Sequence, residues 1–148
     1  MCGPCVTATS ADAGTYLVDT SAAVAFLVGD HDHHDATFEA LADRRLGLAG
    51  HAAFETFSVL TRLPPPSRRT PVTVARLLAA NFPDSRFLSI EGAGRLLTSL
   101  ADHGVAGGSV YDALVGATAV EHGLTLVSRD RRALDIYREL SVEVEMLS

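Results

Sequence analysis

The sequence contains no lysine and no tryptophan, only two cysteines, and no long hydrophobic run. A membrane-spanning helix needs about 20 consecutive apolar residues, so we expect no membrane segment. Two cysteines, Cys2 and Cys5, do not make a disulfide framework, and the residues around them lack the basic start and apolar stretch of a secretory signal. A cytoplasmic location is therefore the default expectation.

Cys2-Gly3-Pro4-Cys5 has the spacing of a thioredoxin-type redox motif. That chemistry needs a strand before the motif and a helix that begins at its first cysteine. The following residues, 6–14, lack helical periodicity. We therefore interpret residues 1–14 as a disordered N-terminal extension and residues 15–148 as a single domain.

The net charge of −6 argues at first sight against a nucleic-acid partner. All 12 basic residues are arginine, however, and seven of them form three clusters, at 44–45, 68–69 and 129–132. Arginine is suited to bidentate contact with phosphate. A GC-rich genome would also explain the missing lysine, and a bound cation would neutralise part of the acidity.

Short apolar runs that favour strands alternate with helical patterns along the chain. The expected strands are 15–18, 45–49, 86–90, 124–127 and 142–144, and Thr20 and Ser21 are expected to cap the first helix. This alternation predicts an α/β fold with a mostly parallel sheet of four or five strands, covered by helices on both faces in a three-layer α/β/α sandwich.

Four acids are expected near one edge of that sheet. Asp19 ends the first strand, Asp130 follows the fourth, Asp112 lies in the first turn of a helix, and Glu55 lies one turn into another. Ligands of open α/β sheets bind beyond the carboxyl ends of the strands. Since four carboxylates repel one another, a hard divalent cation such as Mg²⁺ is expected among them.

Four stretches carry a resemblance to a known family: residues 16–22, 53–60, 111–119 and 126–133, which contain Asp19, Glu55, Asp112 and Asp130 in turn. In order and spacing they resemble the PIN-domain ribonucleases, and in particular the VapC toxins of bacterial toxin–antitoxin pairs. The resemblance covers roughly residues 15–145.

The resemblance implies an endoribonuclease that depends on Mg²⁺ or Mn²⁺. It implies that Asp19 and Asp112 bind the metal, that Glu55 completes the acidic cluster, and that Asp130 supports a second ion or its waters. Thr20 or Ser21 matches a supporting hydroxyl. The implied partners are an RNA substrate and a VapB-type antitoxin, in a homodimer or a hetero-oligomer with that antitoxin.

Each acid also has a structural interpretation. Asp19 suits a turn, Asp112 suits a helix N-terminus, and Asp130 suits a helix cap. Glu55 is harder to explain in this way, because its helix is otherwise apolar and burial of an unpaired acid is costly. Asp135 is a further candidate, which would contact the metal-binding acids and not the metal itself.

Three arginines, Arg129, Arg131 and Arg132, border the expected site and are candidates for contact with RNA phosphates. Residues 30–35 comprise three histidines and three aspartates. This cluster invites a transition-metal hypothesis, but a surface turn followed by a helix cap explains it more simply.

The residues that other α/β functions would require are missing from the sequence. Phosphotransfer domains need a lysine beside the acids, a haloacid-dehalogenase-type phosphatase needs aspartate where Ser21 stands, and dinucleotide binding needs a glycine-rich turn after the first strand. A non-catalytic PIN-like RNA-binding module remains an alternative, although all four acids are present.

Overall fold

The computed structural model describes residues 14–148, so the cysteine motif and the proposed disordered extension up to residue 13 lie outside the described residues. The elements in chain order are β1 (Thr15–Val18), α1 (Thr20–Leu27), α2 (His34–Leu41), β2 (Arg45–Leu48), α3 (His51–Arg62), α4 (Pro71–Asn81), α5 (Ile90–Ser99), α6 (Ser109–His122), β3 (Leu126–Ser128), the 3-10 turn η1 (Arg131–Ala133), α7 (Leu134–Glu139) and β4 (Val144–Met146). Within residues 14–148, no helix has both the length and the apolar character needed to cross a bilayer.

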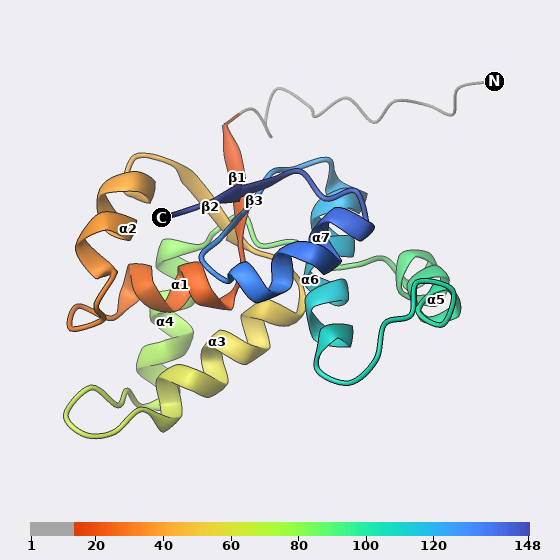
Figure 1. Ribbon diagram of the computed structural model, residues 1–148. Helices are drawn as coiled ribbons and strands as arrows, with labels where there is room; N and C mark the ends of the chain where they lie inside the picture. The colour runs from red at the N-terminus through yellow and green to blue at the C-terminus, as the bar shows by residue number, and fades with distance from the viewer. Residues whose placement is uncertain (1–13) are drawn as a thin grey trace.

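The four strands form one parallel sheet in the order β2-β1-β3-β4. They lie at the centre of the molecule, with the helices around them (Figure 1). β2 lies on one side of β1 and β3 lies on the other, so the direction in which successive strands join the sheet reverses at β1. In open α/β sheets the crevice at such a reversal, beyond the carboxyl ends of the strands, is where ligands bind.

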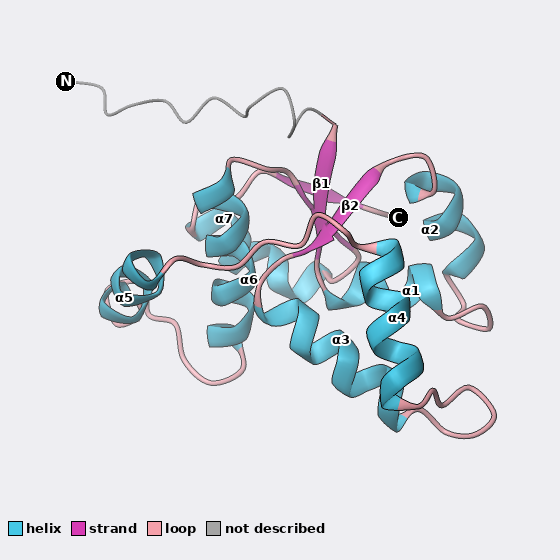
Figure 2. Ribbon diagram, turned by 180° about the vertical axis from the view of Figure 1, so that it is seen from behind, coloured by secondary structure: helices cyan, strands magenta, loops and turns pink. Residues whose placement is uncertain are grey.

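Alternate residues of the strands point to opposite faces of the sheet, and each face has its own core. Leu17 and Leu126 pack in one core with side chains of α3, α6 and α7. Val18 and Val127 pack in the other with side chains of α1 and α2 and with Leu78 of α4. Figure 2 shows this arrangement from behind, with α4 and α2 on one side of the strands and α6 and α7 on the other. The predicted three-layer α/β fold is thus confirmed.

The turn from β2 into α3 depends on a glycine. Gly50 has φ +53°, and a Cβ placed on it would lie 2.6 Å from Oγ1 of Thr118 in α6. Glycine therefore permits both the left-handed backbone and the close approach of α3 to α6. This approach brings the start of α3 beside α6, the two helices that carry Glu55 and Asp112.

The predicted strand at 86–90 is wrong. Arg86 makes a single parallel bridge with Ala49, and Ser89 instead caps α5, accepting a hydrogen bond from the Gly92 N–H at 2.9 Å. Phe87 is 50% exposed and Ile90 is 89% exposed, so the apolar pattern that suggested a strand does not reflect burial. The capping hydrogen bond of Ser89 stabilises the start of α5 and outweighs the weak strand preference of residues 86–90.

The predicted cap of the first helix is also wrong. Asp19, rather than Thr20 or Ser21, is the N-cap residue of α1, and its side chain accepts a hydrogen bond from the Ala22 N–H. The helix therefore begins directly at the end of β1. This placement holds the Asp19 carboxylate at the carboxyl edge of the sheet.

Candidate active site

Asp19 is an almost fully buried carboxylate, 4% exposed, at the end of β1. Its Oδ1 accepts hydrogen bonds from the Ser21 hydroxyl at 2.6 Å and the Ala22 N–H at 3.1 Å, and its Oδ2 accepts one from the Tyr137 hydroxyl at 2.9 Å. Burial raises the pKa of Asp19, and these hydrogen bonds oppose the shift because they favour the charged form. Ser128 adds a further hydrogen bond that favours the charged form of Asp19.

The hydroxyl of Ser21 connects the end of β1 with the end of β3. It donates to Asp19 and accepts a hydrogen bond from the Arg129 N–H at 2.9 Å. Ser128, which is fully buried, accepts one from the Asp130 N–H at 3.0 Å. These hydrogen bonds hold the segment after β3 against Asp19, so the acids at 19 and 130 keep a defined separation.

The structure brings the four acids together. Glu55 comes from α3, Asp112 from the first turn of α6 and Asp130 from the segment after β3, and with Asp19 they line one pocket of about 190 Å³. The pocket lies at the carboxyl ends of β1 and β3, at the reversal of the winding. Two helices and the segments that follow β1 and β3 therefore contribute one carboxylate each.

The pKa of Asp112 is affected by the other three acids of the pocket. Its pKa is raised to about 6, first by partial burial and then by the negative charges of Asp130, Asp19 and Glu55. Like charges favour the neutral acid. The three neighbouring carboxylates therefore add to the effect of burial on the pKa of Asp112.

Glu55 occupies this pocket for a different reason from the one expected. It is exposed, and its neighbour Phe54 is 67% exposed, because the buried side of α3 is formed by Ala52, Thr56 and Leu60. The expectation of a buried, unpaired acid in an apolar helix is wrong. The position of Glu55 in the shared pocket, rather than its burial, makes it a candidate.

The structure confirms the capping role considered for Asp130. Its side chain caps the 3-10 turn η1 by accepting a hydrogen bond from the Arg132 N–H at 3.0 Å. It also pairs with the Arg132 guanidinium at 3.1 Å while it lines the acidic pocket. The charge of Asp130 is therefore partly compensated by a neighbouring arginine.

The pocket has the donors that a hard divalent cation prefers. All four acids supply oxygen ligands. The hydroxyl oxygen of Thr20, which lines the same pocket, is buried and has no hydrogen-bond partner within residues 14–148. In the same part of the chain, no three Asp, Glu, His or Cys side chains are close enough together to hold an ion as they stand. Closer approach of the carboxylates needs a positive charge that offsets their mutual repulsion.

The three arginines lie in different places. Arg132 lines the acidic pocket, and Arg129 lines a hollow beside it. Arg131 is exposed on η1, and Asp135 is exposed on α7. Proximity to the acids therefore separates Arg129 and Arg132 from Arg131.

A larger hollow of about 580 Å³ continues from the acidic pocket past α3 and α6. Glu55, Asp112, Asp130 and Arg132 line both spaces. On the wall of the larger hollow the rings of His51 and Tyr111 stack, with centroids 4.6 Å apart. The acids therefore lie within a longer groove and not in an isolated cavity.

Sequence patterns did not point to Tyr137 or Ser128. Tyr137 is 1% exposed in α7 and reaches Asp19 from 118 residues away. Its aromatic ring looks like an ordinary core residue of a short helix, and nothing local indicates that its hydroxyl faces a carboxylate. Ser128 could have been noticed as a polar residue at the end of an otherwise apolar strand.

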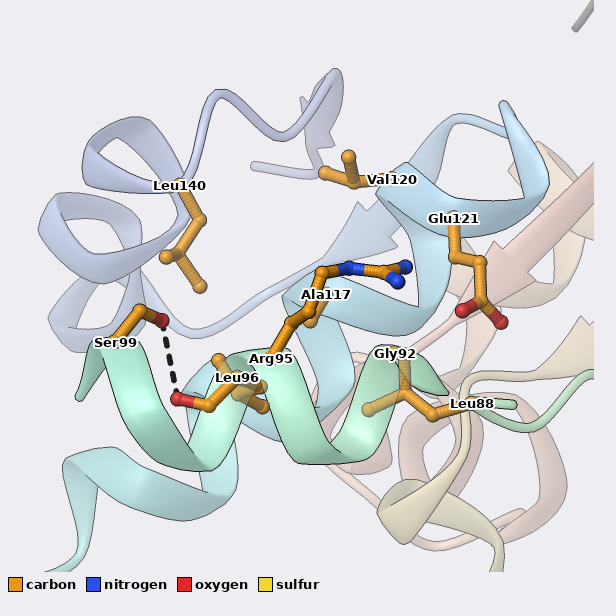
Figure 3. Close-up of a pocket in the computed structure, with 9 residues that line it drawn as sticks. All are labelled: Leu88, Gly92, Arg95, Leu96, Ser99, Ala117, Val120, Glu121 and Leu140. Atoms are coloured by element: carbon orange, nitrogen blue, oxygen red, sulfur yellow. Dashed lines mark hydrogen bonds between the residues drawn. The ribbon is translucent and has the colours of Figure 1, made fainter. Parts of the chain in front are cut away.

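A separate, mainly apolar hollow of about 310 Å³ lies between α5 and α6 (Figure 3). Leu88, Leu96, Ala117, Val120 and Leu140 surround it, and Arg95 extends from α5 across it. Glu121, the acid that Figure 3 shows here, accepts hydrogen bonds from the Ser89 backbone N–H at 2.8 Å and the Ser89 hydroxyl at 2.6 Å. Glu121 is therefore engaged in capping α5, and we assign no chemistry to this hollow.

The structure is therefore that of an α/β protein with a parallel sheet and an acidic pocket at the point where the strand order reverses. The sequence model of the PIN domain matches residues 16–139, and the chain belongs to the PIN domain family.

Relatives cover almost the whole chain. Ribonuclease VapC40 of Mycobacterium tuberculosis is 48% identical over 132 residues, which make up 88% of this chain and 97% of that protein. Ribonuclease VapC27 of the same species is 45% identical over 127 residues, 86% of this chain and 93% of that protein. Among solved structures, VapBC2 from Rickettsia felis bound to a DNA fragment from their promoter superposes with a TM-score of 0.64 at 16% identity, covering 90% of this chain and 99% of that one. That last likeness shows a shared fold.

Proposed function

We propose that this chain is an endoribonuclease that uses Mg²⁺ or Mn²⁺ to cleave RNA phosphodiester bonds. The observation that carries the proposal is that Asp19, Glu55, Asp112 and Asp130 line one pocket at the carboxyl edge of a PIN-domain sheet. The relatives at 48% and 45% identity, Ribonuclease VapC40 and Ribonuclease VapC27, support it.

Each residue has a specific role in this proposal. Asp19 and Asp112 would bind the cation directly, and Glu55 and Asp130 would complete the acidic cluster or hold a second ion. A bound Mg²⁺ or Mn²⁺ supplies an activated water and stabilises charge on the phosphodiester during in-line displacement. Ser21 and Tyr137 orient Asp19 through their hydrogen bonds, and Thr20, whose buried hydroxyl has no hydrogen-bond partner within residues 14–148, lines the same pocket.

The proposal extends to the partners of the chain. Relatives named VapC and a solved neighbour described as a VapBC pair support a toxin whose activity is controlled by a VapB-type antitoxin. We infer that the chain works in the cytoplasm, where RNA is accessible, and that it forms a homodimer or a hetero-oligomer with its antitoxin.

The test measures cleavage of total RNA with Mg²⁺, with Mn²⁺ and with a chelator. The wild type is expected to cleave only with a metal, and Asp19→Asn and Asp112→Asn are expected to lose at least 100-fold in rate because each removes a charged ligand. Asp43→Asn is the matched control, since Asp43 is an exposed acid just before β2, at the opposite edge of the sheet. Equal rates for the wild type and Asp19→Asn would contradict the proposed site.

A further inference from the structure

A hollow of about 290 Å³ adjoins the acidic pocket on the side of the turn between α1 and α2. Its walls are formed by Ser21, His31, His33, Arg129, Asp130 and Arg132. We propose that this hollow, called here the histidine pocket, binds a phosphodiester group of the RNA strand next to the group that is cleaved. The inference rests on the proposed function, because it takes the acidic pocket as the place of cleavage.

The histidine pocket is continuous with the acidic pocket. Ser21, Asp130 and Arg132 line both spaces. A strand of RNA whose reacting phosphate lies among the acids must leave that pocket, and its next phosphate meets whichever wall it passes. The shared residues place the histidine pocket directly on one such path.

The two pockets differ in charge. Four carboxylates and one arginine line the acidic pocket, which leaves three negative charges in excess. Two arginines and one carboxylate line the histidine pocket, which leaves one positive charge even when both imidazoles are neutral. An anionic phosphate that carries no metal is therefore favoured in the histidine pocket and disfavoured among the acids.

The side chain of His31 is held so that it can donate a hydrogen bond. Its Nδ1 accepts a hydrogen bond from the His33 backbone N–H at 3.0 Å. Since Nδ1 is the acceptor, the proton of the neutral imidazole lies on Nε2, which is a donor. The ring of His33 lies beside it, with ring centroids 5.8 Å apart. The pocket thus carries two neighbouring imidazoles that can donate to phosphate oxygens without any change of protonation.

Arg129 is fixed at the pocket before any ligand binds. Its guanidinium donates to Thr37 Oγ1 at 3.2 Å and to the Ser148 carbonyl oxygen at 2.8 Å, and its backbone N–H is bound to Ser21. A guanidinium has about five N–H donors, so these contacts leave others for a ligand. Holding the side chain in advance reduces the entropy lost on binding an anion.

Other members of the cluster at 30–35 have structural roles. The Nδ1 of His34 lies 2.9 Å from the Ala25 carbonyl oxygen, and Asp30 accepts a hydrogen bond from Ser67 at 2.9 Å. These contacts fix the turn between α1 and α2 against α1 and the loop between α3 and α4. His31 and His33 are then the imidazoles of this turn that line the pocket.

The test uses a fluorescein-labelled single-stranded RNA of 12 nucleotides and measures binding by anisotropy in the presence of Mg²⁺. All proteins carry Asp112→Asn, so that the probe is not cleaved. Adding His31→Ala and His33→Ala is expected to weaken binding about tenfold, because hydrogen bonds to a charged group are lost. His103→Ala, which removes an imidazole paired with Glu139 instead, is the control and is expected to leave binding unchanged.

A second pair of substitutions separates phosphate from base contacts. His31→Phe with His33→Phe keeps two aromatic rings but removes their N–H donors, so binding is expected to weaken as much as with alanine. Retained binding in the phenylalanine variant would mean that the rings stack on bases, and the proposal would be wrong. Unchanged binding in the alanine variant would also overturn it. The single variant His33→Ala, at an exposed turn residue, covers the case in which a double variant does not fold.

The outcome is separable from that of the proposed function. Wild-type cleavage of RNA tests the function, and RNA binding by the histidine variants tests the pocket. If the wild type cleaves RNA and the histidine variants show no loss of RNA binding, the histidine pocket is rejected and the nuclease function stands. A tenfold loss of binding without any wild-type cleavage would leave the pocket as an RNA site and reject the nuclease.

Discussion

The hydroxyl of Tyr137 donates a hydrogen bond to Oδ2 of Asp19 at 2.9 Å, and both side chains are almost completely buried. This contact ties α7 to the end of β1 and fixes the orientation of the carboxylate that faces the acidic pocket. Because the bond favours the charged form of Asp19, it opposes the effect of burial on the pKa of that carboxylate.

Replacing Tyr137 by phenylalanine is expected to weaken metal binding while the ring still packs in the core. The Mn²⁺ concentration for half-maximal RNA cleavage should rise several-fold, because the carboxylate loses a donor that favours its charged form. Unfolding in urea should show a loss of about 1–3 kcal/mol, since a buried charged acceptor loses a partner. Tyr16→Phe, in the strand β1 that precedes Asp19, is the control. An unaltered Mn²⁺ requirement in Tyr137→Phe would show that the hydroxyl only stabilises the fold.

Asp112 makes the stability of the metal-free protein depend on pH. Its folded pKa of about 6 lies above the usual 3.8, so the folded state binds more protons than the unfolded state between these values. Stability is therefore lost as the pH rises through this window, and the loss is complete above pH 6. Partial exposure reduces the effect at neutral pH to about 1 kcal/mol.

Asp112→Asn is accordingly expected to be more stable than the wild type by about 1 kcal/mol at pH 7 in the presence of a chelator. The difference should become small near pH 4, where the folded-state acid is protonated and the unfolded-state acid is about half protonated. Urea unfolding at pH 4, 5, 6 and 7 measures it, with Asp43→Asn as the reference. A gain in stability that is the same at every pH would contradict the assignment to Asp112.

Metal binding should raise the melting temperature of the wild type. A ligand present at 100 times its dissociation constant stabilises the folded state by about 2.7 kcal/mol if it does not bind the unfolded chain. Differential scanning calorimetry with Mn²⁺ and with a chelator is the measurement. Asp19→Asn and Asp112→Asn should show little or no shift, and Asp43→Asn should show the full one. A shift of the same size in Asp19→Asn would place the ion elsewhere.

Ser21 is expected to matter for both stability and activity. Ser21→Ala removes a donor to Asp19 and leaves the Arg129 N–H without its acceptor, which costs about 1–3 kcal/mol in unfolding free energy. Cleavage should also fall, because the segment that carries Asp130 is no longer held against Asp19. Thr61→Ala, which removes a hydroxyl bonded within α3, is a suitable comparison. Wild-type cleavage by Ser21→Ala would show that this connection does not organise the site.

The sequence by itself determined the class of fold and the edge of the sheet at which the acids gather. Alternation of apolar strands with helical patterns depends on local periodicity, and a parallel sheet places the ends of β1 and β3 at one edge. Asp19 follows β1 directly and Asp130 lies two residues after β3, so their neighbourhood could be predicted from position in the chain. The same reasoning failed at 86–90, where exposed Phe87 and Ile90 imitate a buried strand.

Only the tertiary structure decided which side chains face those acids. Glu55 reaches the pocket from an exposed position on a helix whose entry depends on Gly50, and Tyr137 reaches Asp19 across 118 residues. The sequence predicts that His31 and His33 lie in a surface turn. The structure places them beside the acids, because α1 leads from Asp19 to that turn. Contacts of this kind depend on how distant elements pack, and neither periodicity nor spacing along the chain records that packing.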